Sequence, residues 1–355
     1  QLLTDEQVLA EIEVRGIQHT QGTMDRIDAA TTRVMPDATG GSIESLLITF
    51  AGVSQTNELS SQYNVRGGSF DENSVYVNGI EVHRPLLIRS GQQEGLSFVN
   101  PEMVENVAFS AGGFGAQYGD KMSSVLDITY KRPRAFEASL SASLLGAHVY
   151  VGHGDSTYSQ MHGLRYKTSK YMLGGLATAG NYNPTYFDYQ TYITWQTGPK
   201  WQMSFLGNVS LNDYRFTPDS LSESFGGQEA KNLTIYYEGQ EKDRFLTAFA
   251  ALSAKGKVSD EVEIGFDLSG FYTNERENFD ITGEYVLSNG SMDETQPSNA
   301  TGEEIDPNAP TVDALGTGLF HQHARNSLEA GVITLAHQGT WQRGNNTLIW
   351  GISGQ

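Results

Sequence analysis

Two histidines near the C-terminal end of the sequence have the spacing of metal ligands. His321 and His323 lie two positions apart, so their side chains would share one face of a β-strand. Imidazole nitrogen is a common zinc ligand, but zinc takes three or four protein ligands. The sequence places no third ligand beside this pair, so it assigns no metal site.

An acidic segment, residues 291–313, carries six carboxylates and no base. Carboxylate oxygens bind Ca²⁺, although the spacing here is not that of an EF-hand. The other interpretation is a solvated loop, and the sequence leaves both open. The carboxylates are Asp293, Glu294, Glu303, Glu304, Asp306 and Asp313.

Catalytic arrangements are not evident. Serine, histidine and aspartate do not occur in an order that indicates an activated nucleophile. No pair of carboxylates indicates a general acid and a general base. Gly113, Gly115 and Gly119 suggest a dinucleotide loop, but their spacing is wrong and no helical pattern follows them. The sequence therefore predicts a protein that is not an enzyme and has no cofactor.

The bulk composition narrows the class of protein. The 355 residues carry a net charge of −19, which argues against nucleic-acid binding and names no other partner. There is no cysteine, so disulfides and thiolate metal sites are excluded. No apolar run is long enough for a transmembrane helix, whereas transmembrane strands leave no such run. Gln1 follows no basic or apolar leader, so we expect any signal peptide to have been removed already.

The first part of the chain, up to about residue 132, mixes one short helix with compact strands. Ser42 and Gly52 would cap and end a helix whose apolar residues recur from Ile43 to Phe50. Asn78-Gly79 predicts a tight hairpin, because both residues tolerate positive φ. Residues 104–109 and 125–130 read as further strands, separated by the glycine-dense residues 112–119.

From about Phe136 onward the sequence alternates in polarity, as strands do when their two faces differ. Residues 189–196 and 262–269 follow this pattern, which a soluble β-sandwich would share. The clearest case is residues 201–211. Its apolar face holds Trp201, Met203, Phe205, Val209 and Leu211, and its polar face holds Gln202, Ser204, Asn208, Ser210 and Asn212. Aromatic residues near strand ends are expected to form interfacial girdles: Tyr182, Tyr186, Phe187, Tyr189, Trp195 and Trp201.

Connection lengths favour a membrane barrel over a sandwich. Outer-membrane barrels alternate short periplasmic turns with long extracellular loops. Short turns are predicted at residues 198–200, 255–260 and 343–346, and long polar loops at residues 214–243 and 276–317. If the turn at Pro199 is periplasmic, residues 136–152 must be two short strands. Nine strands result, and an odd number cannot close an antiparallel barrel, so we expect a fragment.

Four glycine-rich or apolar elements occur in order in the first region: residues 64–80 (NVRGGSFDENSVYVNGI), 98–107 (FVNPEMVENV), 112–119 (GGFGAQYG) and 123–128 (SSVLDI). Together they resemble the plug signature of TonB-dependent receptors. The glycines have a physical reason, since they allow the backbone to turn where a Cβ would clash. Arg66 and Glu105 could pair across a boundary between plug and barrel or simply face solvent. The motif residues are Arg66, Gly67, Gly68, Asn78, Gly79, Gly112, Gly113, Tyr118 and Gly119.

Near the N-terminus, residues 9–14 resemble the segment that holds or adjoins the TonB box in this family. Such a segment would be extended and would add as an edge strand to the sheet of its partner. The interacting residues would be Glu11, Ile12, Glu13 and Val14. The alternative is an ordinary first strand of the plug.

The resemblance implies an all-β transmembrane barrel, of which this chain is the N-terminal fragment, with an α+β plug in its lumen. A full barrel of this family has 22 strands, and the division would be residues 1–15 (periplasmic segment), 16–132 (plug) and 133–355 (first strands). The implied function is uptake of a scarce extracellular ligand across the outer membrane of a Gram-negative cell. The implied partners are TonB and outer-membrane lipid, without nucleic acid. The alternative is a non-transporting scaffold that binds surface lipoproteins or other subunits of an outer-membrane complex.

Overall fold

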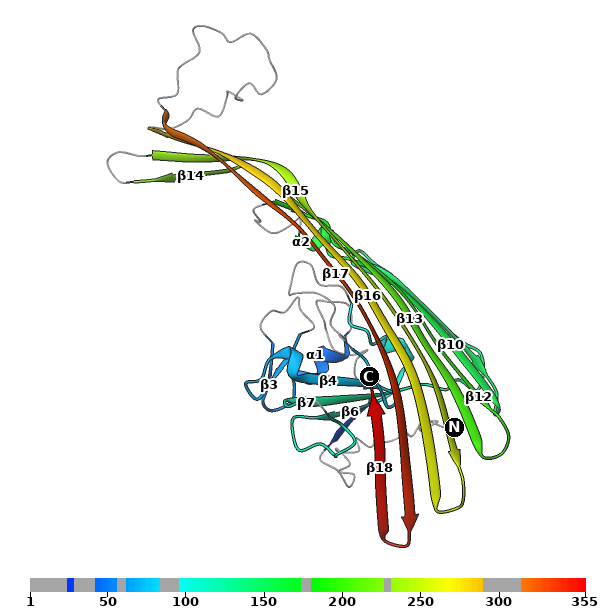
Figure 1. The fold of residues 1–355 in the computed structure, drawn as a ribbon. Coiled ribbons are helices and arrows are strands. Elements are labelled where there is room, and N and C mark those ends of the chain that lie inside the picture. Colours follow the sequence, from blue (N-terminus) through cyan, green and yellow to red (C-terminus); the bar gives the residue numbers. More distant parts are fainter. Residues whose placement is uncertain are drawn as a thin grey trace, which may run out of the picture.

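The computed structural model contains two sheets of different size and shape (Figure 1). The first is a five-stranded sheet built from the N-terminal residues, and the second is an eleven-stranded antiparallel sheet, here called the wall. A two-stranded ribbon accompanies the first. The structure describes residues 24–28, 42–55, 62–83, 96–119, 121–173, 180–226, 231–289 and 314–355.

The N-terminal unit, which comprises the described residues 24–130, has the strand order β1-β6-β7-β4-β5. β4 and β7 run parallel, and the other neighbours run antiparallel. The unit mixes short helices with short strands, as the sequence predicts. Its elements are β1 (Asp25–Asp28), α1 (Ile43–Leu47), β2 (Val53–Ser54), β3 (Asn64–Val65), η2 (Phe70–Glu72), β4 (Asn73–Val77), β5 (Ile80–Glu81), η3 (Pro101–Met103), β6 (Val104–Ser110) and β7 (Ser124–Tyr130).

The predicted helix exists but is shorter than expected. The Ser42 hydroxyl accepts a hydrogen bond from the Ser45 amide at 3.2 Å, which confirms the predicted N-cap. The helix ends at Leu47 rather than near Gly52, because the next amides bond three residues back and form tight turns. Gly52 lies beyond them with φ of +83°.

The predicted hairpin at Asn78 and Gly79 is confirmed. Val77 and Ile80 are register partners, and the two turn residues have φ of 55° and 82°. The Asn78 side chain also accepts a hydrogen bond from the Tyr130 amide at 3.0 Å. The turn is therefore fixed to the end of β7 as well as to its own strands.

The wall has nine strands on its main path, in the order β18-β17-β16-β15-β13-β12-β10-β9-β8. β11 and β14 pair beside that path with β13 and β15. The predicted nine strands and the two short strands within residues 136–152 are confirmed. The bounds are β8 (Glu137–Ser143), β9 (Gly146–Gly154), β10 (Tyr158–Thr168), β11 (Gly180–Tyr182), β12 (Thr185–Gln196), β13 (Trp201–Pro218), β14 (Leu221–Phe225), β15 (Lys231–Lys257), β16 (Val262–Asn289), β17 (Ala314–Arg343) and β18 (Asn346–Gly354); a short helix, α2 (Lys170–Leu173), follows β10.

The prediction of two long structureless loops was wrong where the structure describes these segments. Residues 290–313 lie outside the described residues, so both interpretations of the acidic segment 291–313 stay predictions. β13, β14 and β15 occupy most of the first segment; in the second, β16 continues to Asn289 and β17 begins at Ala314. These extensions are rich in polar and charged residues, although apolar side chains still recur in places, as at Leu233 and Ile235 or at Phe279 and Ile281. The ladder persists because main-chain hydrogen bonds between paired strands do not depend on side-chain polarity.

The two faces of the wall differ as the alternation predicts. On β13, Asn208, Ser210 and Asn212 are buried on the concave side, whereas Val209 is exposed on the convex side. Phe187 and Tyr189 are likewise exposed on the convex side. Tyr186 was wrongly assigned to the girdle: it is buried and faces the concave side.

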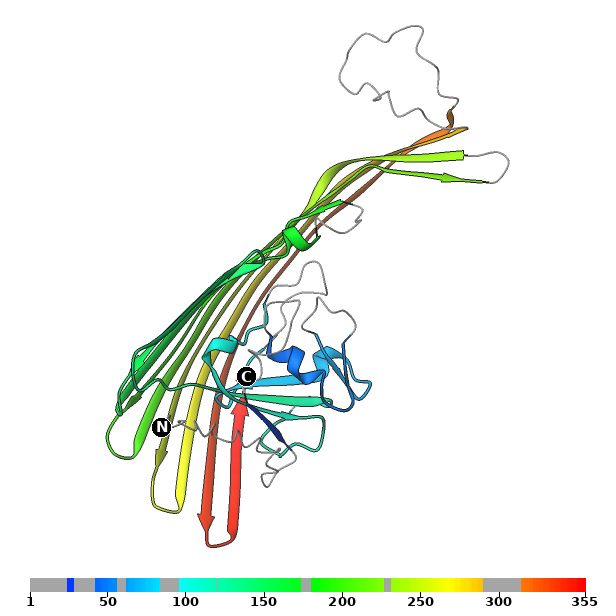
Figure 2. The same ribbon diagram turned by 180° about the vertical axis from the view of Figure 1, so that it is seen from behind.

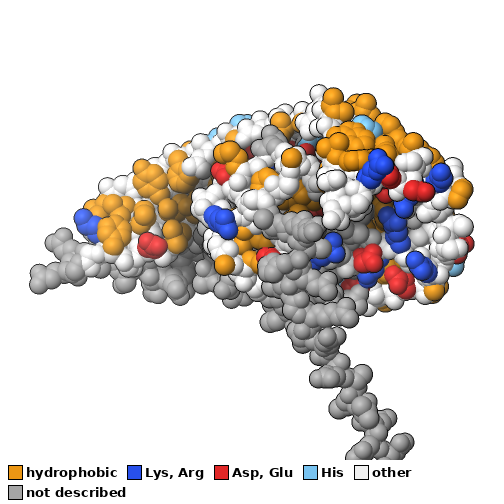
Figure 3. All heavy atoms as spheres, turned by 90° about the horizontal axis from the view of Figure 1, so that it is seen from below, with side chains coloured by type: hydrophobic (Ala, Val, Ile, Leu, Met, Phe, Trp, Pro, Cys, Tyr) orange, Lys and Arg blue, Asp and Glu red, His pale blue; other side chains and the backbone are white. Residues whose placement is uncertain are grey.

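The convex face carries a continuous belt of exposed apolar side chains. A tilted transmembrane strand needs about 9–11 residues, and the apolar stretch at residues 201–211 of β13 has that length. An exposed apolar surface of this extent is typical of a membrane-facing one. Figure 3, viewed from the end with the short turns, shows hydrophobic side chains along the margin of the wall. The belt includes Val149, Val151, Leu164, Phe187, Val209, Leu252, Phe266, Leu268, Ile333 and Leu335.

None of the helices in the described residues is long and apolar enough to span a membrane.

The N-terminal unit lies on the concave side of the wall, in the half nearer the short turns (Figures 1 and 2). One hydrophobic cluster joins the two parts. Ile43, Val107 and Leu126 of the N-terminal unit belong to the same cluster as Phe249 and Phe271 of the wall. The fold class predicted from the sequence, part of a large antiparallel barrel with an α+β plug inside its curve, is confirmed.

Candidate functional site

Several contacts between the N-terminal unit and the wall involve a short segment, residues 97–103, here called the docking segment. Asn100 caps the 3₁₀ turn η3, because its side chain accepts a hydrogen bond from the Glu102 amide at 3.1 Å and Pro101 occupies the first turn. The capped turn directs the carbonyls of residues 97–99 toward β10 and β12. These carbonyls are the acceptors that the wall side chains bind.

Arg165 and Asp188 form a buried ion pair at this contact. The two residues are direct register partners on β10 and β12, and they are 5% and 0% exposed. The Arg165 Nε donates to Asp188 Oδ1 at 2.9 Å, and Nη2 donates to Oδ2, which makes the pair bidentate. The remaining donors of Arg165 reach the docking segment at the carbonyls of Val99 (2.8 Å) and Ser97 (2.9 Å).

Gln190 makes a second polar connection beside the ion pair. Its side chain is fully buried, and its amide nitrogen donates to the Phe98 carbonyl at 2.7 Å. Its amide oxygen accepts from the Tyr130 hydroxyl at 2.8 Å. One wall residue therefore holds the docking segment and the end of β7 together.

Gly163 makes room for the docking segment. A Cβ at this position would lie 2.3 Å from Asn100 Nδ2 and 3.2 Å from Met103 Sδ. Met103 and Met161 are fully buried beside it. Close approach of the two backbones thus depends on a glycine in the wall.

A polar cavity of about 630 Å³ separates the N-terminal unit from the wall at the end with the short turns. It lies between the Asn78-Gly79 hairpin and β12, β13 and β15–β17. Lys255 crosses it to the Asn78 carbonyl at 3.2 Å, and Arg132 reaches Gln202 at 2.7 Å.

Three plug-motif residues, Arg66, Gly67 and Gly68, have functions in local folding that the structure makes explicit. Arg66 and Gly67 both have positive φ, 49° and 83°, in the turn after β3. At Gly68 a Cβ would lie 1.9 Å from Ser123 Oγ, which itself bonds to Glu72 at 2.6 Å. Gly68 is therefore required by packing between two distant parts of the motif.

The second glycine motif forms the connection between β6 and β7. Gly112 and Gly113 have φ of 111° and 75°, whereas a Cβ at Gly119 would meet open space. The Tyr118 hydroxyl donates to Asp127 Oδ2 at 2.6 Å, and its ring meets that of Tyr76 edge-on. Burial raises the pKa of both Tyr118 and Asp127.

Of the two alternatives for Arg66 and Glu105, the structure supports the solvent-facing one. Both are exposed, and neither forms an ion pair in the part of the chain that the structure describes. Among the charged groups that do make contacts across the boundary, Arg165 and Lys255 of the wall donate to carbonyls of the N-terminal unit, and the Glu102 carboxylate accepts from Ser139 of the wall at 2.9 Å. Sequence reasoning missed them, although a charged residue at a concave-facing position of an alternating strand is a usable signal. The predicted segment Glu11 to Val14 lies outside the described residues.

Comparison with known proteins identifies one family model. Residues 17–125 match the model for the TonB-dependent Receptor Plug Domain. No curated protein matches the sequence.

Several solved structures resemble the chain at low sequence identity. The siderophore receptor PirA from Acinetobacter baumannii is 13% identical, with a TM-score of 0.44, over 93% of this chain and 56% of that protein. The outer membrane transporter YddB from Escherichia coli is 10% identical, with a TM-score of 0.45, over 93% and 56%. FpvA from Pseudomonas aeruginosa, solved with bound pyoverdine, is 9% identical, with a TM-score of 0.45, over 92% and 56%. This chain thus spans little more than half the length of each.

Proposed function

Because residues 17–125 are a TonB-dependent receptor plug domain, we propose that the protein is a TonB-dependent transporter of the Gram-negative outer membrane. It binds a scarce extracellular ligand and imports it when the energised plug rearranges. The observation that carries this proposal is the plug domain on the concave side of a strand wall whose convex face is an apolar belt.

The docking segment suits a plug that must move without unfolding the wall. The side-chain contacts of Arg165 and Gln190 with the plug end on main-chain carbonyls of residues 97–99 and on one tyrosine hydroxyl. Arg165 remains neutralised by Asp188 within the wall when these contacts break. The wall therefore keeps a paired charge, and release of the plug leaves no isolated ion.

TonB is the proposed partner, and the proposed contact is Glu11 to Val14. An extended segment with alternating side chains can add to the edge of a partner sheet, since its main-chain groups supply the hydrogen bonds. A pull on this segment would reach the docking segment through β1, which pairs with β6 directly after η3.

A single cysteine tests the proposal without knowledge of the ligand. The sequence has no cysteine, and Ser97 is buried in the docking segment, so Ser97→Cys introduces one protected thiol of nearly the same size. We expect a membrane-permeant maleimide to label it several-fold faster in energised cells with TonB than in cells without TonB. Deletion of residues 1–15 should lower labelling to the rate seen without TonB.

Ser259→Cys serves as the control, because Ser259 is exposed in the short turn between β15 and β16 and should be labelled equally in all cells. Equal labelling of Ser97→Cys with and without TonB would contradict transport. It would support the alternative class, a scaffold with a fixed plug.

A further inference from the structure

The ends of β16 and β17 extend beyond the apolar belt. On the convex face of β16, Phe266, Leu268 and Tyr272 lie within the belt, and polar residues replace them from Asn274 onward. Asp280 therefore lies outside the lipid-facing region, in the half of β16 that is farther from the short turn between β15 and β16. Its side chain is exposed on the same face of the sheet as the belt.

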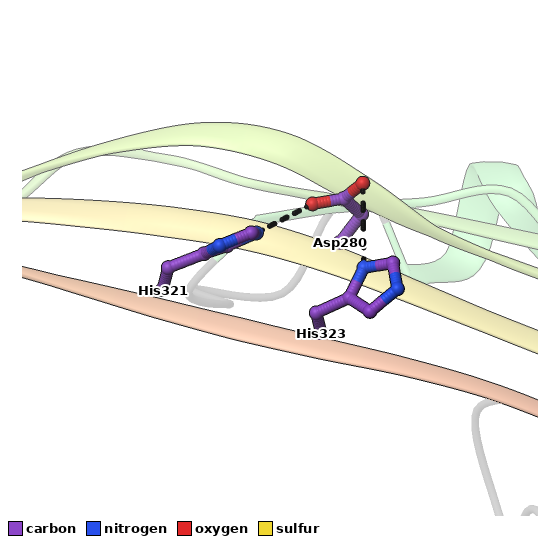
Figure 4. Close-up of side chains that lie close together, drawn as sticks. All are labelled: Asp280, His321 and His323. Atoms are coloured by element: carbon purple, nitrogen blue, oxygen red, sulfur yellow. Dashed lines mark hydrogen bonds and ion pairs between the residues drawn. The ribbon is translucent and has the colours of Figure 1, made fainter.

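The strand register brings both histidines of the sequence pair to this aspartate. Asp280 is the direct partner of His323, and His321 is the partner of Thr282, so all three side chains share one face. His321 Nε2 lies 2.8 Å from Asp280 Oδ1, and His323 Nδ1 lies 3.6 Å from Oδ2. Figure 4 shows the two rings on either side of the carboxylate.

These three groups form the ligand set that borderline transition metals prefer. Ligand atoms from all three residues lie within 4.8 Å of one another. A tetrahedral Zn²⁺ with bonds of about 2.0–2.1 Å places its ligand atoms about 3.4 Å apart. Because all three side chains are about half exposed, rotation about their side-chain bonds can close this difference while the ladder keeps the backbone fixed.

We propose that Asp280, His321 and His323 bind a divalent transition-metal ion such as Zn²⁺ and thereby tie β16 to β17 outside the membrane. Two imidazoles and one carboxylate supply three ligands, which leaves at least one coordination position of the metal for water. Arg325, two residues beyond His323 on the same face, opposes Asn278 rather than Asp280. The site lies on the convex face, so it is independent of the docking segment and of the proposed transport.

Zinc binding to the tag-free full-length protein in detergent tests the proposal. We expect isothermal titration calorimetry to show one Zn²⁺ per chain, with Ca²⁺ in excess failing to compete, because Ca²⁺ prefers oxygen ligands. His321→Gln with His323→Gln should weaken Zn²⁺ binding at least about tenfold. Asp280→Asn alone should weaken it as well.

His153→Gln is the matched control, because His153 is an exposed histidine on β9 outside this cluster. It should leave the affinity for Zn²⁺ unchanged. The three sites are exposed on an extension of the wall, so the variants should fold, and retained trypsin resistance of the wall checks this. Absence of stoichiometric Zn²⁺ binding, or equal affinity in the double glutamine variant, would overturn the proposal.

Discussion

At the scale of single residues, the contact between plug and wall depends on Arg165, whose charge is neutralised within the wall by Asp188. Arg165 is bidentate with Asp188 and uses its other donors for the docking segment. Taking an arginine out of water is costly unless its charge is neutralised and its donors are satisfied. Asp188 on the neighbouring strand neutralises the charge, and the carbonyls of Ser97 and Val99 in the docking segment satisfy the other donors.

Removal of Arg165 alone should be far more damaging than removal of the pair. Arg165→Ala leaves Asp188 buried without its partner, and we expect a loss of about 3–5 kcal/mol in the stability of the docked plug. The double variant Arg165→Ala with Asp188→Ala should recover much of that loss. Protease cleavage of the plug across a urea titration measures the loss of stability in each variant. An equal loss in the single and the double variant would contradict this explanation.

Gly68 and Gly119 offer a matched pair of glycine substitutions within the plug motif. Gly68→Ala places a Cβ against Ser123 Oγ and disrupts the bond to Glu72, so we expect a cost of about 1–3 kcal/mol. Gly119→Ala should be close to neutral, because nothing lies within 4 Å of the added carbon. Protease cleavage of the plug at increasing urea concentrations distinguishes the two variants. Similar urea midpoints of cleavage for both would refute the packing argument.

At the scale of elements, the strands of the wall combine a membrane-crossing stretch with a long extension. β15, β16 and β17 have 27, 28 and 30 residues, about three times the length that crosses a bilayer. The part nearer the short turns carries the apolar belt on its convex face. The upper part is held by the same ladder, and its convex face becomes polar where lipid ends.

A charged residue introduced in the middle of the belt should therefore lower the free energy of unfolding of the wall more than one introduced at the edge of the belt. Leu252 is 48% exposed near the middle of the belt on β15, and Leu252→Arg should destabilise the wall by about 2–4 kcal/mol in lipid vesicles. Thr185→Arg, at the polar end of β12 opposite Asp213, should cost about 0–1 kcal/mol. Urea-induced unfolding from vesicles measures the difference, and equal costs would place the bilayer elsewhere.

At the scale of the whole molecule, the two parts are held together by different interactions. The wall is one continuous ladder, whereas the plug is a separate sheet that meets the wall through side chains and one shared hydrophobic cluster. Among the described residues, no strand of the plug sheet pairs with a strand of the wall. The plug can therefore separate without breaking the ladder.

Hydrogen exchange should reveal this difference. We expect amides of β6 and β7 to exchange at lower urea concentration than amides of β13, β15 and β16, since local stability follows the cooperative unit that must open. Exchange of both sheets at one common urea concentration would indicate a single cooperative unit. That result would also weaken the proposed plug rearrangement.

Local patterns in the sequence determined the elements and their faces. The turn at Asn78-Gly79, the nine strands and the apolar convex face follow from φ preferences and from a period of two, which involve only neighbouring residues. The order of motifs also identified the plug. None of this required knowledge of which strands lie side by side.

The tertiary structure decided what meets across strands. Arg165 with Asp188, and Asp280 with the two histidines, are brought together by register, and one-residue slips would move each side chain to the other face. The sequence also missed the long extensions, because polar and charged residues predominate in them and only the pairing with neighbouring strands shows that they continue the ladder. Sequence periodicity thus determines which face of the sheet a side chain is on, whereas only the register between paired strands determines which side chains it contacts.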